Sequence, residues 1–338
     1  MIRLLLSILI AIPALAQQPL TPAADVAILK GLPKLAKPVY VWPEVDLLLR
    51  VRDPGYCELV RVSGTVNIRL ENLDEAYIDS ASRLMRTYNA KLAIHYSPYY
   101  KIFAPGAKPG SQDPRRDGAA ELKWLAEQLR LLRLYCRWYG VSFVEVFLDT
   151  ECFTYRIDDA EWNLALDRKY NDVYALWKSA FPQCRIHWFG RGWQRVSLFI
   201  DGGIQAETFG DMHQSGDSVS CALYRLDQPY EGRASMAATL AGSKGQPVVL
   251  WLCPGGCYRQ DWEVYVLDAT SHHDVSWDWL AGYMMAYKPW SQADVIAIWP
   301  GMWEQSPKGA WTQNTRHFAA WVRGVSRVRK LDDLRGDK

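Results

Sequence analysis

The sequence predicts an α/β fold, and within that class a single (β/α)8 TIM barrel, from three observations. Short β-branched or aromatic runs alternate with longer segments of helical periodicity along most of the 338 residues. The short runs are almost continuously apolar, which is typical of parallel strands that are buried on both faces. About eight strand–helix units follow one another in roughly 300 residues, a length that one barrel uses as a single domain.

The first elements of the predicted barrel follow a leader and an approach segment. Residues 39–42 are a short β-branched and aromatic run and predict the first strand. The region 47–70 is ambiguous, and we expect the second strand within it. Residues 74–88 carry an apolar face at helical spacing, and 91–96 predict the third strand, which ends before Pro98. A loop rich in Pro, Gly and charge is expected at 105–118.

The clearest helix of the sequence comes next. Asp117 is placed to cap its start, and Gly140 to end it. Its apolar residues follow the three–four spacing; they are Leu122, Leu125, Leu129, Leu132 and Cys136. Residues 141–149 predict the fourth strand and 161–180 the helix behind it. The remaining units are expected as strands at 184–189, 219–225, 247–252 and 294–299, with helices at 234–241, 277–287 and 312–325.

The first 16 residues have the pattern of a secretory signal peptide. Arg3 precedes an apolar run, and the small-x-small triplet Ala14-Leu15-Ala16 ends the segment. The run is shorter than the roughly 20 residues that cross a bilayer. We therefore expect cleavage after Ala16, an extended segment at 17–38, the barrel at 39–330 and a polar tail at 331–338. The mature protein is expected to be secreted or periplasmic, with no membrane association.

The amino-acid composition indicates which classes of partner the protein is expected to bind. Lys and Arg total 39 against 37 Asp and Glu, a net charge of +2, so the chain has no broad electrostatic attraction to nucleic acid or anionic lipid. The unusual feature is aromatic: 16 Trp and 18 Tyr exceed what one core needs. Such amphipathic rings suit the flat faces of sugars, and a polysaccharide or glycan is the expected substrate.

The fourth strand carries the most informative carboxylates. In a strand, alternate side chains share a face, which places Glu145, Phe147, Asp149 and Glu151 together and leaves Val144, Val146 and Leu148 for packing against helices. Active sites of barrels form at the C-terminal ends of the strands, where Asp149 and Glu151 fall. Two carboxyls this close raise the pKa of one of them, and a glycosidase acid needs such a raised pKa.

The segment 143–151 resembles the strand-four Asp-x-Glu motif of family 18 glycoside hydrolases, the chitinases and endo-N-acetylglucosaminidases, and the shorter motif of hyaluronidases. The resemblance implies that Glu151 is the general acid/base. It implies that Asp149 orients the acetamido group of an N-acetylhexosamine, whose own oxygen attacks the anomeric carbon. The family's strand-six tyrosine would correspond to Tyr224, and its strand-eight tryptophan to Trp299. The family's motif has further aspartates where this chain has other residues.

Other side chains are expected at the same rim, where they would line an aromatic groove with hydrogen-bonding tips. They follow the third, fifth and eighth strands, and we expect substrate contacts from His95, Tyr96, His187, Arg191, Trp193, Glu207 and Trp303. Arg191 would also suit an acidic sugar.

Three alternatives stay open. The chain can be a chitinase-like barrel that binds glycan without cutting it. It can also be a two-carboxylate glycosidase whose second carboxylate is Glu207 or Glu304, because the seventh strand ends without one. A metal hydrolase would need ligands such as His95, yet the sequence has no His-x-His on the first strand and no HExxH. No phosphate-binding GxxxxGK[ST] occurs either, and we expect no cofactor and no metal.

Overall fold

The fold is seen in a computed structural model of the chain. It describes residues 21–41, 51–98, 113–149, 159–189, 196–200, 203–206, 215–223, 239–240, 243, 245–252, 293–298, 318–319 and 322–323. For 196–200, 203–206, 221–223 and 252 it describes the backbone alone.

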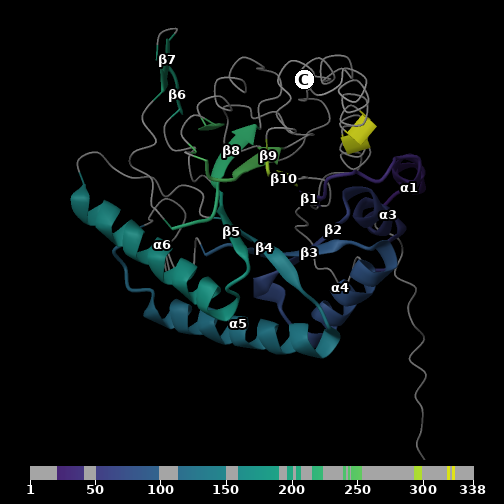
Figure 1. Cartoon of the computed structure of the whole chain (residues 1–338), viewed down its shortest axis with the longest axis horizontal. Helices are drawn as coiled ribbons and strands as arrows, with labels where there is room; N and C mark the ends of the chain where they lie inside the picture. The colour runs from purple at the N-terminus through teal and green to yellow at the C-terminus, as the bar shows by residue number, and fades with distance from the viewer. Residues whose placement is uncertain are drawn as a thin grey trace, which may run out of the picture.

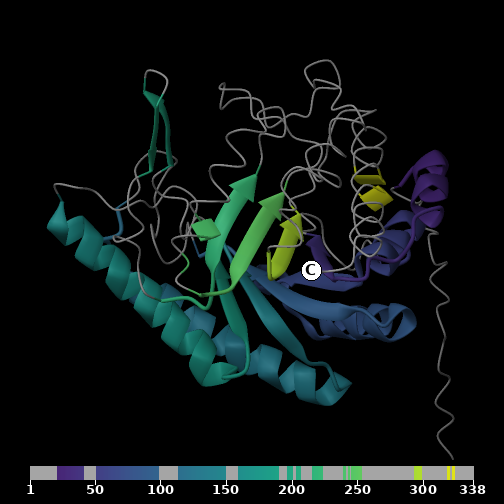
Figure 2. The same cartoon turned by 45° about the horizontal axis from the view of Figure 1, so that its top comes forward.

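Two four-stranded parallel sheets make up the wall of the fold. One has the order β2-β3-β4-β5 and the other β1-β10-β9-β8, so strands far apart in sequence lie side by side (Figure 2). Their bounds are β1 Val39–Val41, β2 Thr65–Arg69, β3 Lys91–Tyr96, β4 Phe143–Leu148, β5 Arg185–Trp188, β8 Val219–Leu223, β9 Val248–Leu252 and β10 Val295–Ile298.

Hydrogen bonds outside the strand ladders join the two sheets at two seams. At the β1–β2 seam, Thr65 Oγ1 donates to the carbonyl of Val39 at 2.6 Å, and Asn67 Nδ2 donates to that of Val41. At the β5–β8 seam, the Asp217 N–H donates to the carbonyl of Ile186 at 2.9 Å, and the Ile186 N–H donates to Asp217 Oδ2 at 2.8 Å. The strands thus follow one another around a ring in chain order.

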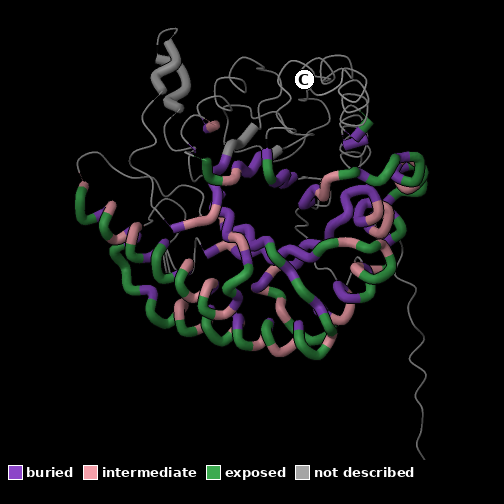
Figure 3. The backbone as a smooth tube through the Cα atoms, in the orientation of Figure 1, coloured by how far each residue is buried: buried purple, intermediate pink, exposed green. Residues whose placement is uncertain are grey.

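This ring is the predicted (β/α)8 barrel, which is confirmed. Figure 3 shows the strands as a ring of mainly buried segments, and Figure 1 shows helices α4 to α6 covering the outside of β2 to β5. The helices described in full are α1 Ala23–Lys30, α3 Pro54–Ser63, α4 Glu75–Tyr88, α5 Ala119–Tyr139 and α6 Ala160–Ala180, with a 3-10 turn η1 at Leu70–Asn72. Within these described ranges, no helix is both long and apolar enough to cross a bilayer.

Local sequence explains where the helices begin and end. An aspartate carboxylate accepts a main-chain N–H of the first turn in three of them: Asp53 in α3, Asp74 in α4 and Asp159 in α6. Helices α3 and α5 end at Gly64 and Gly140, with φ of 71° and 61°, a left-handed conformation that glycine adopts without strain. Asp117 contributes as expected, because its carboxylate accepts the N–H of Ala119 at 2.9 Å.

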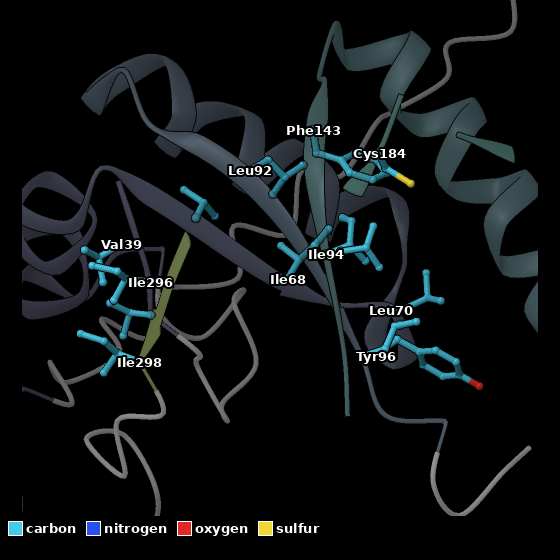
Figure 4. Close-up of a cluster of buried hydrophobic side chains, with 14 of the residues drawn as sticks. Val39, Ile68, Leu70, Leu92, Ile94, Tyr96, Phe143, Cys184, Ile296 and Ile298 are labelled. Atoms are coloured by element: carbon cyan, nitrogen blue, oxygen red, sulfur yellow. The ribbon is translucent and has the colours of Figure 1, made fainter. Parts of the chain in front are cut away.

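Alternate residues of each strand pack on opposite sides of the wall. The outward side chains form the large core against the helices, and Figure 4 shows members of it from several strands. The inward ones form a separate buried cluster along the barrel interior: Tyr40, Ala93, Phe147, Phe189, Val249, Trp251, Val295 and Ala297. A barrel interior filled in this way is a packed core, so ligands bind at its ends.

The structure corrects two expectations near the start of the barrel. Residues 17–38 are expected to be extended, but 23–30 form α1, because this helix buries Leu29 and packs beside α3. Asp53 holds the preceding chain in place by accepting the Thr21 N–H at 3.1 Å and the Thr21 hydroxyl at 2.5 Å. The ambiguous region 47–70 contains the second strand, as expected, but also α3.

The later elements agree with the expected order where the structure describes them. β5, β8, β9 and β10 lie within or at the edges of the four expected strands. A hairpin of β6 Val196–Ile200 and β7 Gly203–Ala206 was not expected, and it pairs only with itself in the described part of the chain. The helix expected at 277–287 lies outside the described residues, as do the leader and the tail.

Candidate active site

The interior of the barrel ends in an aromatic layer near the C-terminal ends of the strands. The ring of Phe147 lies 5.2 Å from that of Tyr40 and 5.5 Å from that of Trp251. Phe189 meets Trp251 edge-on at 5.1 Å, a favoured geometry for aromatic pairs. All four rings are buried, and together they form an aromatic floor inside the barrel.

A β-bulge sets which way the fourth strand faces. The pairing with β3 skips Val144, since Leu92 is opposite Phe143 and Ala93 is opposite Glu145. Val144 is consequently 41% exposed, whereas the sequence predicted that it packs against the helices. Past the bulge the alternation holds: Glu145 and Phe147 point inward, as predicted.

Glu145 does not stand at the mouth but lies deep in the barrel, in a polar network. Its Oε2 is 2.5 Å from His187 Nε2, and its carboxylate accepts two hydrogen bonds from Arg185. His187 Nδ1 is 2.8 Å from the hydroxyl of Ser218. His187, expected at the rim, therefore lies inside the barrel wall.

In this network the Glu145 carboxylate is a buried charge that is paired with neighbouring groups. Burial by itself would raise the pKa of Glu145, but the hydrogen bonds and charges of His187 and Arg185 outweigh it and leave the pKa below its ordinary value. Burial, and then the charge of Glu145, raises the pKa of Tyr40. The network thus holds Glu145 ionised, so this carboxyl cannot act as a protonated acid.

The order Ser218–His187–Glu145 is that of a nucleophile, a base and an orienting acid. A catalytic role would require access for a substrate carbonyl. The three residues are only 1%, 0% and 2% exposed, respectively. The chain of hydrogen bonds is therefore part of the barrel's interior packing and not a hydrolytic site.

The network predicts acid sensitivity. The folded-state pKa of Glu145 is lower than its ordinary value of 4.5, so its stabilising contribution is complete above that pH and is lost as pH falls through the folded-state pKa. Denaturant unfolding measured from about pH 6 downward should show a steeper loss of stability for the wild type than for Glu145→Gln, which cannot ionise. Equal slopes for the two proteins would contradict the assignment.

Asp149 lies where the sequence predicts, directly after β4 at the C-terminal end of the barrel. Its N–H donates to the carbonyl of Tyr96 at 3.0 Å, and its own carbonyl accepts the Ser97 hydroxyl at 3.4 Å. The next strand is tied to the same end, because the Phe189 N–H donates to the carbonyl of Leu148 at 2.8 Å. Asp149 is half-buried.

The two residues expected at the end of the third strand face opposite ways. His95 shares the inward face with Ala93 and is buried, and burial followed by the charge of Arg69 lowers its pKa, so it is neutral. Tyr96 belongs to the outer core and its ring lies 5.9 Å from that of Trp124 on α5. The structure therefore brings His95, but not Tyr96, to the interior side.

The other expected site residues lie outside the described residues. They are Glu151, Arg191, Trp193, Glu207, Tyr224, Trp299, Trp303 and Glu304. In the part of the chain that is described, no three His, Cys, Asp or Glu side chains form a group that could hold a metal ion.

Two features of this region were not predicted from the sequence. One is the partnership of Glu145 with His187 and Ser218, and the other is a tie between Glu71 and Ser97, whose N–H donates to Glu71 Oε1 at 2.9 Å. The only sequence signal for the first was the inward phase of Glu145. Nothing in the sequence indicated the second, since the two residues are 26 positions apart.

Comparison with known proteins concerns the fold. No protein-family model matches the sequence, and no curated protein matches it either. Among solved structures the chain is similar to an L-ribulose 3-epimerase, with a TM-score of 0.52 and 10% identity over 90% of this chain and 99% of that one.

Two glycoside hydrolases are similar to the same degree. An exo-β-1,4-mannosidase from Opitutaceae bacterium strain TAV5 has a TM-score of 0.53 and 11% identity, covering 94% of this chain and 62% of that one. A GH5 enzyme from Bifidobacterium longum, in complex with Manβ1-4GlcNAc, has a TM-score of 0.50 and 10% identity, covering 85% and 77%. The specific resemblance to family 18 is not confirmed. The chain is thus a TIM-type barrel, a fold it shares with glycoside hydrolases and with a sugar epimerase.

Proposed function

We propose that this protein is an exported glycoside hydrolase that cleaves a polysaccharide or glycan above the aromatic floor. Glu151 acts as general acid/base and Asp149 assists it. The substrate we favour is an N-acetylhexosamine glycan, whose acetamido oxygen would attack the anomeric carbon while Asp149 orients it. Export rests on the signal-peptide pattern of residues 1–16.

The observation that carries the proposal is the position of Asp149. Its main chain is held at the C-terminal end of β4 by the carbonyl of Tyr96. We propose that Glu151, two positions after Asp149 in the sequence, acts at this same end of the barrel. Two carboxyls that act on one substrate shift each other's pKa, and such a pair can keep one proton near neutral pH.

The buried network supports the same division of roles. Glu145 is ionised and enclosed, which leaves the carboxyls at the end of the strand as the ones that meet a substrate. The floor of Phe147, Phe189 and Trp251 closes the barrel below them and excludes water from beneath a bound sugar.

The test is hydrolysis of a panel of bacterial, fungal and animal polysaccharides, measured as the release of reducing ends. Glu151→Gln keeps the shape of the side chain but cannot donate a carboxylic proton, so activity should fall about a hundredfold or more. Asp149→Asn should reduce activity toward N-acetylated substrates most strongly. Glu161→Gln, an exposed carboxyl on α6, is the matched control and should leave activity unchanged.

Other outcomes identify the alternatives. Full activity in Glu151→Gln would exclude the acid/base assignment, and loss of activity in Glu207→Gln or Glu304→Gln would indicate a two-carboxylate glycosidase. Glycan binding without turnover would indicate a lectin-like barrel. Isomerised monosaccharides in NMR spectra, with no hydrolysis, would instead indicate an epimerase.

A further inference from the structure

Glu71 stands at the C-terminal end of the second strand, in the turn η1. Its Oε1 accepts the main-chain N–H of Ser97 at 2.9 Å, and Ser97 directly follows β3. A hydrogen bond to an ionised acceptor is stronger than a neutral one. The carboxylate of Glu71 therefore ties the end of β2 to the end of β3.

The tie continues to the fourth strand. The Ser97 hydroxyl donates to the carbonyl of Asp149 at 3.4 Å, and the Asp149 N–H donates to the carbonyl of Tyr96 at 3.0 Å. Both main-chain polar groups of Asp149 are thus held by the two residues that Glu71 fixes. Three strand ends are joined at the point where the proposed reaction takes place.

The second carboxylate oxygen of Glu71 has an unusual environment. Oε2 is buried and accepts no hydrogen bond from the described residues. A buried polar atom without a partner costs free energy, and natural proteins retain such departures mainly at functional sites. A residue needed only to complete a turn would not require this carboxylate.

We infer that Glu71 is a positioning residue, which acts through Ser97 to hold Asp149, and with it the catalytic end of β4, in place. The inference rests on the proposed function for its effect on catalysis, but the positional effect is measurable without a substrate. Glu71 touches no substrate in this role. It sets the position from which Asp149 acts, and small displacements of catalytic groups have large effects on rate.

The experiment compares Glu71→Ala with Glu71→Gln, whose carbonyl oxygen still accepts the Ser97 N–H. Glu75→Ala is the matched control, because Glu75 also accepts a single hydrogen bond, from the Tyr139 hydroxyl at 2.7 Å, at a site that does not reach β4. Hydrogen exchange of main-chain amides and steady-state kinetics are measured for all three variants and the wild type.

In Glu71→Ala, the amides of Ser97 and Asp149 should exchange about tenfold faster or more, while those of β9 and β10 stay as in the wild type. The kcat should fall about tenfold with KM changed by less than about twofold, and Glu71→Gln should recover most of both effects. Glu75→Ala should match the wild type throughout.

Unchanged exchange at Ser97 and Asp149 in Glu71→Ala would overturn the inference. Equally accelerated exchange in every strand would also overturn it, because Glu71 would then only stabilise the fold. If the wild type hydrolyses no glycan, the proposed function fails, and the exchange data alone still decide whether Glu71 holds the end of β4.

Discussion

Glu145→Ala is expected to lower the free energy of unfolding by roughly 3–5 kcal/mol, the cost of removing one partner of a buried ion pair. The substitution leaves His187 enclosed without its partner at 2.5 Å. Arg185 is 41% exposed at its side chain and can be rehydrated, which places the expected loss at the lower end of the range. Urea unfolding followed by circular dichroism measures it.

Two further variants make the Glu145 result interpretable. Glu127→Ala removes a carboxylate from an exposed pair with Arg130 and should leave stability unchanged. Glu145→Met combined with His187→Leu replaces both buried polar groups by apolar ones, and it should destabilise less than the sum of the two single changes. Additive losses would show that the two side chains do not interact.

Trp251→Ala is the second large effect, with an expected loss of roughly 3–5 kcal/mol. Trp251 is fully buried on β9 and contacts both Phe147 and Phe189 edge-on. Its removal leaves a cavity at the centre of the barrel that β9 cannot move to fill, because β9 is held by parallel pairing with β10 on one side and β8 on the other. Thermal and denaturant unfolding measure the change.

Trp138→Ala is the matched control for Trp251, since the same indole is removed from a site that is 60% exposed on α5. It should change stability by less than about 1 kcal/mol. Similar losses for the two variants would contradict the packed aromatic floor, and would mean that Trp251 does not fill the barrel interior. Trp251→Phe should give an intermediate loss, because a smaller ring still fills part of the space.

Much of the barrel could be predicted from local pattern. Strand positions, the helix cap Asp117 and the stop at Gly140 depend on residues within a few positions of one another. The inward phase of Glu145 and Phe147 is equally local, since alternate side chains of a strand share a face.

The site could be predicted only in part. Asp149 lies at the predicted end of β4, but Tyr96 faces α5, because it is the adjacent His95 that shares the inward phase of β3. The helical conformation of 23–30 depends on contacts with α3. The exposure of Val144 depends on a β-bulge in the pairing with β3. Neither partner is near in sequence, so local propensity had no information about them.

The sequence by itself determined the fold class, the inward phase of Glu145 and the place of Asp149 at the end of the fourth strand, because hydrophobic period and strand alternation are properties of neighbouring residues. Only the tertiary structure decided that Glu145 is enclosed by His187 and Arg185, and that Glu71 is tied to Ser97. These contacts join different strands, and their geometry depends on the register and closure of the whole barrel. The chemistry of a carboxyl is set by its surroundings, and those are fixed only when the ring of strands closes.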